Sequence, residues 1–192
     1  MKVFVYLGIM KRYEIINQII KDKKYQSYLE IGLGDGVNFT KVECQDRIGI
    51  DPKADDEHAE LYECTSDEFF DSVNVTFDLI FIDGLHHAEQ VERDIVNSWE
   101  CLNKGGMILI HDIKPENEQM TYRPRQTKKW TGDVYRAWHG LQIKYPKLKL
   151  GYIEDEHGIG TITKTRHKIE GGFVSDVTFL TYYANKLWLP KY

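Results

Sequence analysis

The stretch that decides the fold is Tyr28-Leu29-Glu30-Ile31-Gly32-Leu33-Gly34-Asp35-Gly36. It begins as an apolar strand and ends in a turn in which every second residue is glycine. Glycine has no Cβ, so such a turn lets backbone N–H groups come close to a ligand. Asp51 follows the next apolar run, about twenty residues on, where a carboxylate can accept hydrogen bonds from a ribose diol. Together the two features predict a nucleoside-bearing cofactor.

The spacing of the glycines bears on which cofactor this is. Gly32, Gly34 and Gly36 give the pattern G-x-G-x-G, whereas a dinucleotide seated on a helix N-terminus calls for G-x-G-x-x-G. The pattern therefore disfavours a nicotinamide cofactor. A plain tight turn between a strand and a helix is the alternative that binds nothing.

Composition limits the class of protein. The 192 residues are 42% hydrophobic and 29% charged, which suits one globular domain over residues 1–192. A net charge of −5 argues against a nucleic-acid binder that neutralises many phosphates. The apolar segment Val3 to Met10 is too short to span a membrane. Three cysteines without CxxC spacing (Cys44, Cys64 and Cys101) predict reduced thiols and a cytoplasmic protein.

Apolar runs alternate with helix-like segments along the chain, which predicts an α/β, Rossmann-like, doubly wound sheet of seven mostly parallel strands. The expected strands lie near residues 28–32, 47–51, 61–64, 77–82, 107–111, 148–153 and 159–164. The expected helices lie near residues 11–24, 88–102 and 133–144, and a further one begins at Ser66 and carries Phe69 and Phe70. The last two strands are close enough in sequence to form an antiparallel hairpin. The domain then consists of a core over about 25–165, the N-terminal helix and an aromatic tail over about 167–192.

Three local features complete this prediction. Ser66 is expected to cap the N-terminus of the second helix. The run Asn103-Lys104-Gly105-Gly106 is expected to stop the helix that precedes it. Residues 114–129 have no periodicity and predict a long irregular loop of the kind that often serves as a lid. In the tail, five aromatic residues could form a contact between two copies of the chain: Phe173, Phe179, Tyr182, Tyr183 and Trp188.

A second group of polar residues follows the apolar run 77–82. Asp83 ends this strand, and His86 comes three residues later, so both can point into the crevice at the carboxyl edge of the sheet. Histidine near its unperturbed pKa can take a proton from an acceptor hydroxyl or amine. The alternative is that His86 is an ordinary loop residue.

A third group is His111-Asp112, at the end of the next parallel strand. Asp83, His111 and Asp112 could converge there and hold a divalent ion such as Mg²⁺ or Mn²⁺. In the other interpretation Asp112 orients the substrate or a histidine, and no metal binds.

The order of these motifs resembles that of the class I S-adenosylmethionine-dependent methyltransferases, and most closely the group called methyltransferase family 24. The resemblance covers about residues 25–165 and is most specific in the Asp-Gly-Leu-His run 83–86 followed by Gly105-Gly106 and His111-Asp112. It also takes in Asp51-Pro52, the run 65–70, residues 130–134 and the turn 155–160. Related metal-dependent O-methyltransferases carry a later acidic pair, from which His111-Asp112 departs.

The resemblance implies a role for each matched position. The turn from Glu30 to Gly36, including Gly32, Gly34 and Asp35, would hold the methionine end of S-adenosylmethionine. Asp51 and Pro52 would border the ribose, and Thr65 and Ser66 the adenine. Asp83 would lie near the cofactor's amino group or the acceptor. His86 matches the family's base, with Asp112 as its partner in catalysis.

These observations predict an enzyme that transfers a methyl group from S-adenosylmethionine, to an oxygen of a small molecule or a sugar or glycan. Methyl transfer is an in-line displacement, so positioning supplies most of the catalysis, and a histidine base helps when the acceptor is a hydroxyl. Two alternatives are a nicotinamide-dependent oxidoreductase and a non-catalytic cofactor-binding protein on the same scaffold. The sequence does not identify the acceptor.

Overall fold

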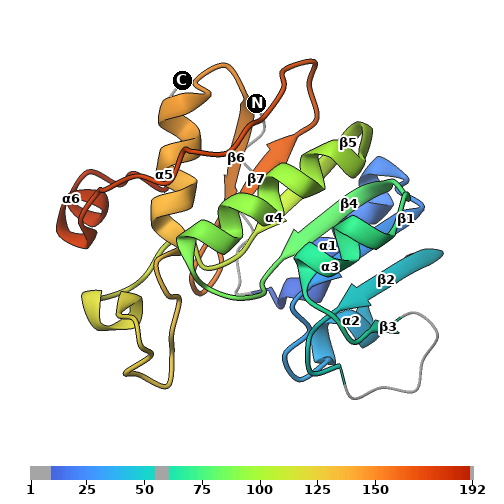
Figure 1. Ribbon diagram of the computed structural model, residues 1–192, viewed down its shortest axis with the longest axis horizontal. Helices are drawn as coiled ribbons and strands as arrows, with labels where there is room; N and C mark the ends of the chain where they lie inside the picture. Colours follow the sequence, from blue (N-terminus) through green and yellow to red (C-terminus); the bar gives the residue numbers. More distant parts are fainter. Residues whose placement is uncertain (1–9, 55–60, 191–192) are drawn as a thin grey trace.

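The computed structural model describes residues 10–54 and 61–190 (Figure 1). Within these residues seven strands form one sheet in the order β3-β2-β1-β4-β5-β7-β6. The strands are β1 (Ser27–Ile31), β2 (Asp46–Ile50), β3 (Leu61–Tyr62), β4 (Phe77–Ile82), β5 (Leu102–Ile110), β6 (Lys149–Ile153) and β7 (Ile159–Thr163). The first five strands are parallel, and β7 is antiparallel to both β5 and β6. The predicted sheet and its C-terminal hairpin are confirmed.

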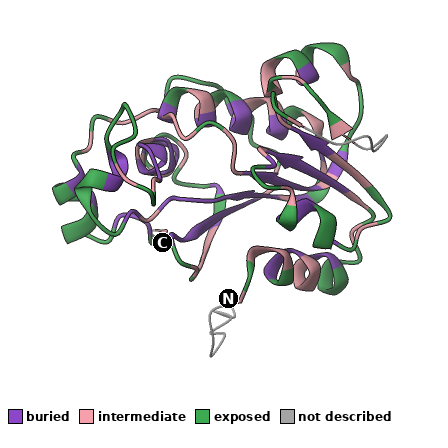
Figure 2. Ribbon diagram, turned by 90° about the horizontal axis from the view of Figure 1, so that it is seen from below, coloured by how far each residue is buried: buried purple, intermediate pink, exposed green. Residues whose placement is uncertain are grey.

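Helices cover both faces of this sheet (Figure 2). They are α1 (Arg12–Lys23), α2 (Val37–Lys41), α3 (Ser66–Ser72), α4 (Ala88–Cys101), α5 (Val134–Lys144) and α6 (Phe179–Ala184), with a 3₁₀ turn η1 (Glu118–Thr121). Helices α1 and α2 pack on one face, and α3, α4 and α5 pack on the other. Helix α2 follows the glycine turn directly and was not foreseen from the sequence.

Strand β4 shows why both faces must be covered. Its side chains alternate between the faces, so Leu79 and Phe81 pack against α1 while Ile80 and Ile82 pack against α4. All four side chains are almost completely buried. An apolar run with no polar face is typical of a central parallel strand.

The strand order places the crevice of the fold. The chain winds outward from β1 in one direction through β2 and β3, and from β4 in the other direction through β5. In open α/β sheets, ligands bind at the carboxyl ends of the strands where the order reverses. That point lies between β1 and β4, so the glycine turn after β1 and Asp83 after β4 meet there.

The predicted cap of α3 is wrong by one residue, whereas the helix predicted to stop before the run 103–106 does end there, at Cys101. Thr65, not Ser66, caps α3: its Oγ1 accepts from the N–H of Glu68, whose carboxylate accepts from the N–H of Thr65, a reciprocal capping box. The helix α4 also passes into β5 at Leu102 without a loop. The run 103–106 forms a bulge in β5, because Phe77 pairs with Leu102 but Leu79 pairs with Met107.

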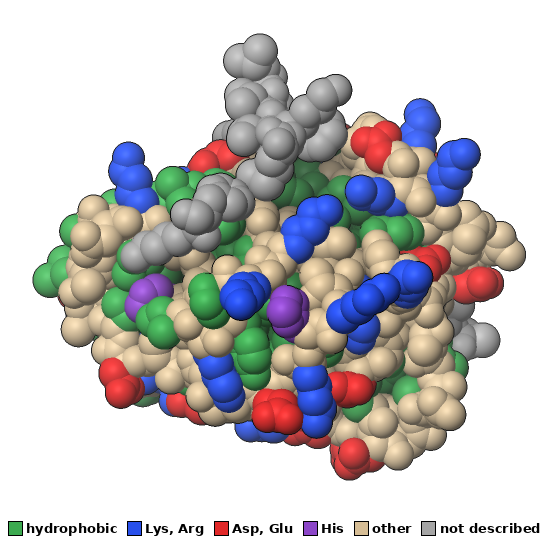
Figure 3. All heavy atoms as spheres, turned by 90° about the horizontal axis from the view of Figure 1, so that it is seen from above, with side chains coloured by type: hydrophobic (Ala, Val, Ile, Leu, Met, Phe, Trp, Pro, Cys, Tyr) green, Lys and Arg blue, Asp and Glu red, His purple; other side chains and the backbone are tan. Residues whose placement is uncertain are grey.

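The aromatic tail packs on the body of its own chain. Phe173, Phe179, Tyr182 and Trp188 are buried in the core that α4 and α5 share, so the structure does not offer them as a contact between two copies. Of the five residues in that prediction Tyr183 alone is exposed, at 41%. Figure 3 shows apolar side chains gathered on the side where α6 lies, and Leu180 and Leu189 are exposed there.

The segment Val3 to Met10 lies, apart from Met10, outside the described residues. No helix in the described ranges is both long and apolar enough to cross a membrane.

Candidate functional site

The glycine turn brings the ends of β1 and β4 into direct contact. Gly32 has φ +86°, and a Cβ there would lie 2.4 Å from the carbonyl oxygen of Asp83 and 2.4 Å from Cα of Gly84. Gly34 and Gly36 also have positive φ, but a Cβ on either would meet no atom within 4 Å. Gly32 is therefore needed for packing, while Gly34 and Gly36 are needed for the course of the backbone and leave open space above it.

Asp51 lies beside this turn. Its Oδ2 accepts from the N–H of Leu33 at 3.0 Å, and its Oδ1 accepts from the N–H of Lys53 at 2.8 Å. Each carboxylate oxygen keeps a free lone pair, because a carboxylate can accept about four hydrogen bonds. The carboxylate is thus fixed by the backbone and still able to accept from a ligand.

Glu30 is buried beneath the turn, at 1% exposure. Its Oε2 accepts from the hydroxyl of Tyr28 at 2.6 Å and from Nδ2 of Asn38 at 3.0 Å. Burial raises the pKa of Glu30 to about 7, although both hydrogen bonds act in the opposite direction. Oδ1 of Asn38 is buried without a hydrogen-bond partner. Glu30 and Asn38 can therefore both accept hydrogen bonds from a ligand.

A second buried carboxyl lies beyond Thr65 and Ser66. Asp94, on α4, accepts from Oγ of Ser66 at 2.6 Å and from Nε2 of Gln90 at 3.0 Å. Burial raises the pKa of Asp94 to about 6. Sequence reasoning missed Gln90 and Asp94, since nothing in the helical pattern of α4 sets them apart from solvent-facing polar residues.

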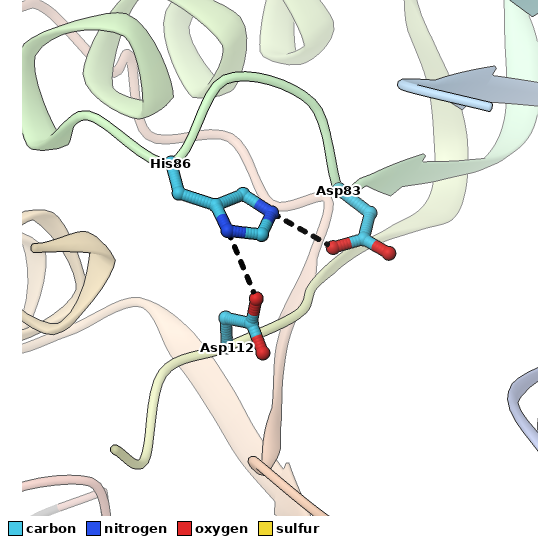
Figure 4. A group of neighbouring side chains, drawn as sticks. All are labelled: Asp83, His86 and Asp112. Atoms are coloured by element: carbon cyan, nitrogen blue, oxygen red, sulfur yellow. Dashed lines mark ion pairs between the residues drawn. The ribbon is translucent and has the colours of Figure 1, made fainter. Parts of the chain in front are cut away.

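Asp83, His86 and Asp112 converge at the carboxyl ends of β4 and β5 (Figure 4). Nε2 of His86 lies 3.4 Å from Oδ1 of Asp83, and its Nδ1 lies 3.2 Å from Oδ2 of Asp112. Asp112 has φ +61°, a left-handed conformation that costs a residue other than glycine some free energy. This conformation turns the chain after β5 while the Asp112 carboxylate lies against the imidazole.

His111 lies behind this group and is buried. Its Nδ1 bonds Oδ1 of Asp83 at 3.1 Å, and its Nε2 bonds Oδ2 of Asp155 at 3.2 Å. The same Nδ1 is 3.2 Å from Oδ1 of Asp112, an oxygen that has no hydrogen bond of proper geometry. Arg12, at the start of α1, pairs with Oδ2 of Asp83.

The carboxylates and imidazoles set one another's protonation. Burial by itself would lower the pKa of His111, but the charges of Asp112 and Asp83 raise it well above its usual range. The pKa of His86 is also raised, against burial, by its contacts with Asp83 and Asp112. Burial opposes the charge on Asp83, yet the two imidazoles hold its pKa below the usual range, while burial raises the pKa of Asp112. The carboxylates therefore favour a positive charge on both imidazoles.

Trp130 forms one wall beside His86. The two rings stack with their centroids 5.3 Å apart and their planes at 25°. The carbonyl oxygen of Trp130 lies 3.0 Å from Nδ1 of His86. A carbonyl can only accept, so in the neutral imidazole this contact favours the tautomer with its proton on Nδ1, in which Nε2 can take one up.

One cavity of about 920 Å³ joins these groups. Gly36 of the glycine turn does not line it, but the other residues predicted for the site do: Glu30, Gly32, Gly34, Asp35, Asp51, Pro52, Thr65, Ser66, Asp83, His86, His111 and Asp112. Sequence reasoning missed Arg12, Trp130, Asp155 and His157, which also line it. These come from the first residue of α1, from the long loop and from the β6–β7 turn, and only the resemblance over residues 130–134 and 155–160 pointed near them.

Comparison with known proteins identifies the class. Residues 23–113 match the model of a family described as a methyltransferase domain, which spans the glycine turn and every residue of the acid and histidine cluster up to Asp112. Residues 23–113 thus form a methyltransferase domain, and the chain is similar to the class I S-adenosylmethionine-dependent methyltransferases. It is 26% identical to an uncharacterized methyltransferase of Bacillus cytotoxicus over 152 residues, which cover 73% of this chain and 71% of that protein.

Solved structures share the fold of this methyltransferase. The SAH-bound methyltransferase of Podospora anserina aligns with a TM-score of 0.62 at 17% identity, covering 82% of this chain and 80% of that one. An O-methyltransferase from Bacillus cereus in complex with SAH aligns with a TM-score of 0.56 at 12% identity, covering 83% and 84%.

Proposed function

We propose that this methyltransferase transfers the methyl group of S-adenosylmethionine to a hydroxyl oxygen of a small molecule or sugar, with His86 as the base. When bound, the cofactor supplies a methyl group on a positively charged sulfur. The observation that carries the proposal is the cavity that the glycine turn and His86 line together. The structurally similar Bacillus cereus protein, described as an O-methyltransferase, supports oxygen as the acceptor atom.

The residues of the cavity fit this cofactor. A Cβ at Gly34 or Gly36 would enter open space, as expected of a cradle that a ligand fills. The unpaired Oδ1 of Asn38 and the half-ionised Glu30 can accept from an amino group. In this proposal the methionine end lies along Glu30, Gly32, Gly34 and Asp35, the ribose along Asp51 and Pro52, and the adenine along Thr65 and Ser66.

His86 is oriented for its role by two neighbours. The carbonyl of Trp130 holds the proton on Nδ1, so the hydroxyl proton of the acceptor moves to Nε2 as its oxygen takes up the methyl group. The imidazole becomes positively charged, and the carboxylates of Asp112 and Asp83, within 3.4 Å of its nitrogens, stabilise that charge. Asp112 is a positioning residue because it acts through His86.

A divalent ion is the alternative way to activate the hydroxyl. One ligand atom each from Asp83, His86 and Asp112 lie within 4.8 Å of one another, and two carboxylates with an imidazole suit Mn²⁺ or Mg²⁺. His111 was the third ligand expected from the sequence, but both of its nitrogens already face carboxylates. Such an ion would lower the pKa of the acceptor hydroxyl, and would compete with Arg12 for Asp83.

The test has two parts. Isothermal titration with S-adenosylmethionine and S-adenosylhomocysteine should detect both ligands, whereas NAD(H) should give no heat. Methyl transfer is then followed over a panel of hydroxylated acceptors with the wild type and H86Q. Absence of binding by both ligands would refute the cofactor assignment. Binding without turnover on any acceptor would leave a non-catalytic binding protein, and full activity of H86Q would remove His86 from the mechanism.

A further inference from the structure

The long loop 114–129 carries four cations in one short run: Arg123, Arg125, Lys128 and Lys129. Two of them are neutralised by carboxylates of the same chain. Arg123 pairs with Glu89 at 2.7 Å and with Asp133 at 3.1 Å, and Lys129 pairs with Glu156. Neither Arg123 nor Lys129 lines the cavity.

The other two cations behave differently. Arg125 and Lys128 are exposed and have no carboxylate partner anywhere in the described ranges, and both line the cavity that holds His86. Of the four loop cations, the two without a carboxylate partner among the described residues are thus the two that line the cavity. Unpaired cations at the mouth of a cleft attract an anionic ligand and raise its local concentration.

Arg125 is held in place although it is exposed. Its Nε donates to the carbonyl of Thr127 at 2.9 Å, and one Nη donates to the carbonyl of Lys128. Its guanidinium lies 5.9 Å from the ring centroid of Trp130. These contacts use only some of its five N–H groups and leave Nη1 free for a ligand, so little conformational entropy remains to be lost on binding.

The arrangement also fixes a distance from the base. The Arg125 guanidinium lies 5.9 Å and the His86 ring 5.3 Å from the centroid of the Trp130 ring, so the guanidinium and the imidazole are no further apart than the sum of these two distances. A sugar phosphate is long enough to reach both groups. An acceptor whose anionic group meets Arg125 can therefore present a hydroxyl on the far side of its ring to Nε2 of His86.

Two carboxylates beside the imidazoles already have cationic or imidazole partners of their own. Asp83 is paired with Arg12, His86 and His111, and Asp155 with His111. Arg125 and Lys128 together match a doubly charged anion, since the arginine fork binds two oxygens of a phosphate and the lysine adds a point charge.

From these contacts we infer that the methyl acceptor carries a phosphoryl group, bound by Arg125 and Lys128 at the rim of the cavity, and a hydroxyl directed at His86. This inference rests on the proposed function, because it names the substrate class of the same site.

The test uses the full chain saturated with S-adenosylhomocysteine. Glucose 6-phosphate is titrated as the probe by calorimetry at low ionic strength, with glucose and glucuronate as matched neutral and carboxylate ligands. We expect glucose 6-phosphate to bind at least about tenfold more tightly than either, and R125Q and K128Q each to weaken it about tenfold, the loss of one charge-assisted contact. K129Q removes one positive charge from the same loop but outside the cavity, and should change the affinity less than about twofold.

Three results would overturn the inference. The first is that glucuronate binds as tightly as glucose 6-phosphate. The second is that K129Q weakens glucose 6-phosphate binding as much as R125Q and K128Q do. The third is that K128Q, a variant that leaves the Arg125–Trp130 contact intact, does not change the affinity. The titration with S-adenosylhomocysteine separates this failure from failure of the proposed function: if that ligand binds and glucose 6-phosphate does not, the phosphoryl assignment alone is wrong.

Discussion

The contact between the ends of β1 and β4 makes Gly32 the most sensitive position of the glycine turn. In Gly32→Ala the new Cβ would lie 2.4 Å from the backbone of both Asp83 and Gly84, where no side-chain rotation can relieve the clash. Gly34→Ala is the matched control, because Gly34 also has positive φ but would place its Cβ in open space.

The two changes share one cost and differ in another. A left-handed conformation costs alanine about 1–2 kcal/mol, which applies to both variants. Separating two packed strand ends costs about 1–3 kcal/mol more, which applies to G32A alone. We therefore expect G34A to lose about 1–2 kcal/mol of unfolding free energy and G32A about 2–5 kcal/mol.

Urea unfolding without ligand measures the difference, because the cofactor would itself meet a side chain at either position. With the slope m unchanged, the unfolding midpoint of G32A should fall clearly below that of G34A. Thermal midpoints should follow, at about 2–4 °C for each kcal/mol in a domain of this size. Equal destabilisation of the two variants would show that the strand ends are not in contact and would refute the reasoning.

Three further predictions concern protonation and metal. The rate of methyl transfer should rise with pH through a midpoint above 6.5, since His86 must be neutral to accept a proton and its pKa is raised; a midpoint below 6 in the profile of kcat would contradict this. In the folded protein Glu30 keeps its proton up to about pH 7, whereas in the unfolded chain it ionises near pH 4.5. The free energy of unfolding should therefore fall by about 3 kcal/mol as the pH rises from 4.5 to 7. Urea unfolding at pH 5 and pH 8 should show this fall in the wild type and lose it in E30Q. Arg12→Gln should strengthen Mn²⁺ binding, followed by electron paramagnetic resonance, because it frees an oxygen of Asp83, and unchanged affinity would argue against the donor set.

Much of this site follows from one property of the sequence. Glu30 lies in the first strand, and Asp51, Asp83 and Asp112 each come at or just after the end of an apolar strand. In a parallel sheet those ends share one edge. Periodicity therefore predicted the strands, their common edge and the residues that meet there.

The parts that could not be predicted come from segments without such a pattern. Arg12 begins α1 as one more charged residue of an amphipathic helix, yet the packing of that helix brings it onto Asp83. Asp155 lies in an acidic turn where Glu154 and Glu156 look equivalent, and only the β6–β7 pairing selects it to meet His111. Likewise, the two glycines at 105–106 follow the end of α4 as expected, but only the pairing of Leu102 with Phe77 shows that β5 begins before them.

The position of the aromatic tail in the sequence determines when, during synthesis, the catalytic site can be completed. The buried hydroxyl of Tyr182 donates at 2.7 Å to the carbonyl of Ile113, the residue after Asp112, although 69 positions separate the two in the chain. During synthesis on a ribosome the carboxyl end emerges last. The motifs for the cofactor are therefore all made well before the segment that anchors the catalytic edge of β5, so a nascent chain can form the cofactor cradle earlier than it can hold Asp112 against His86.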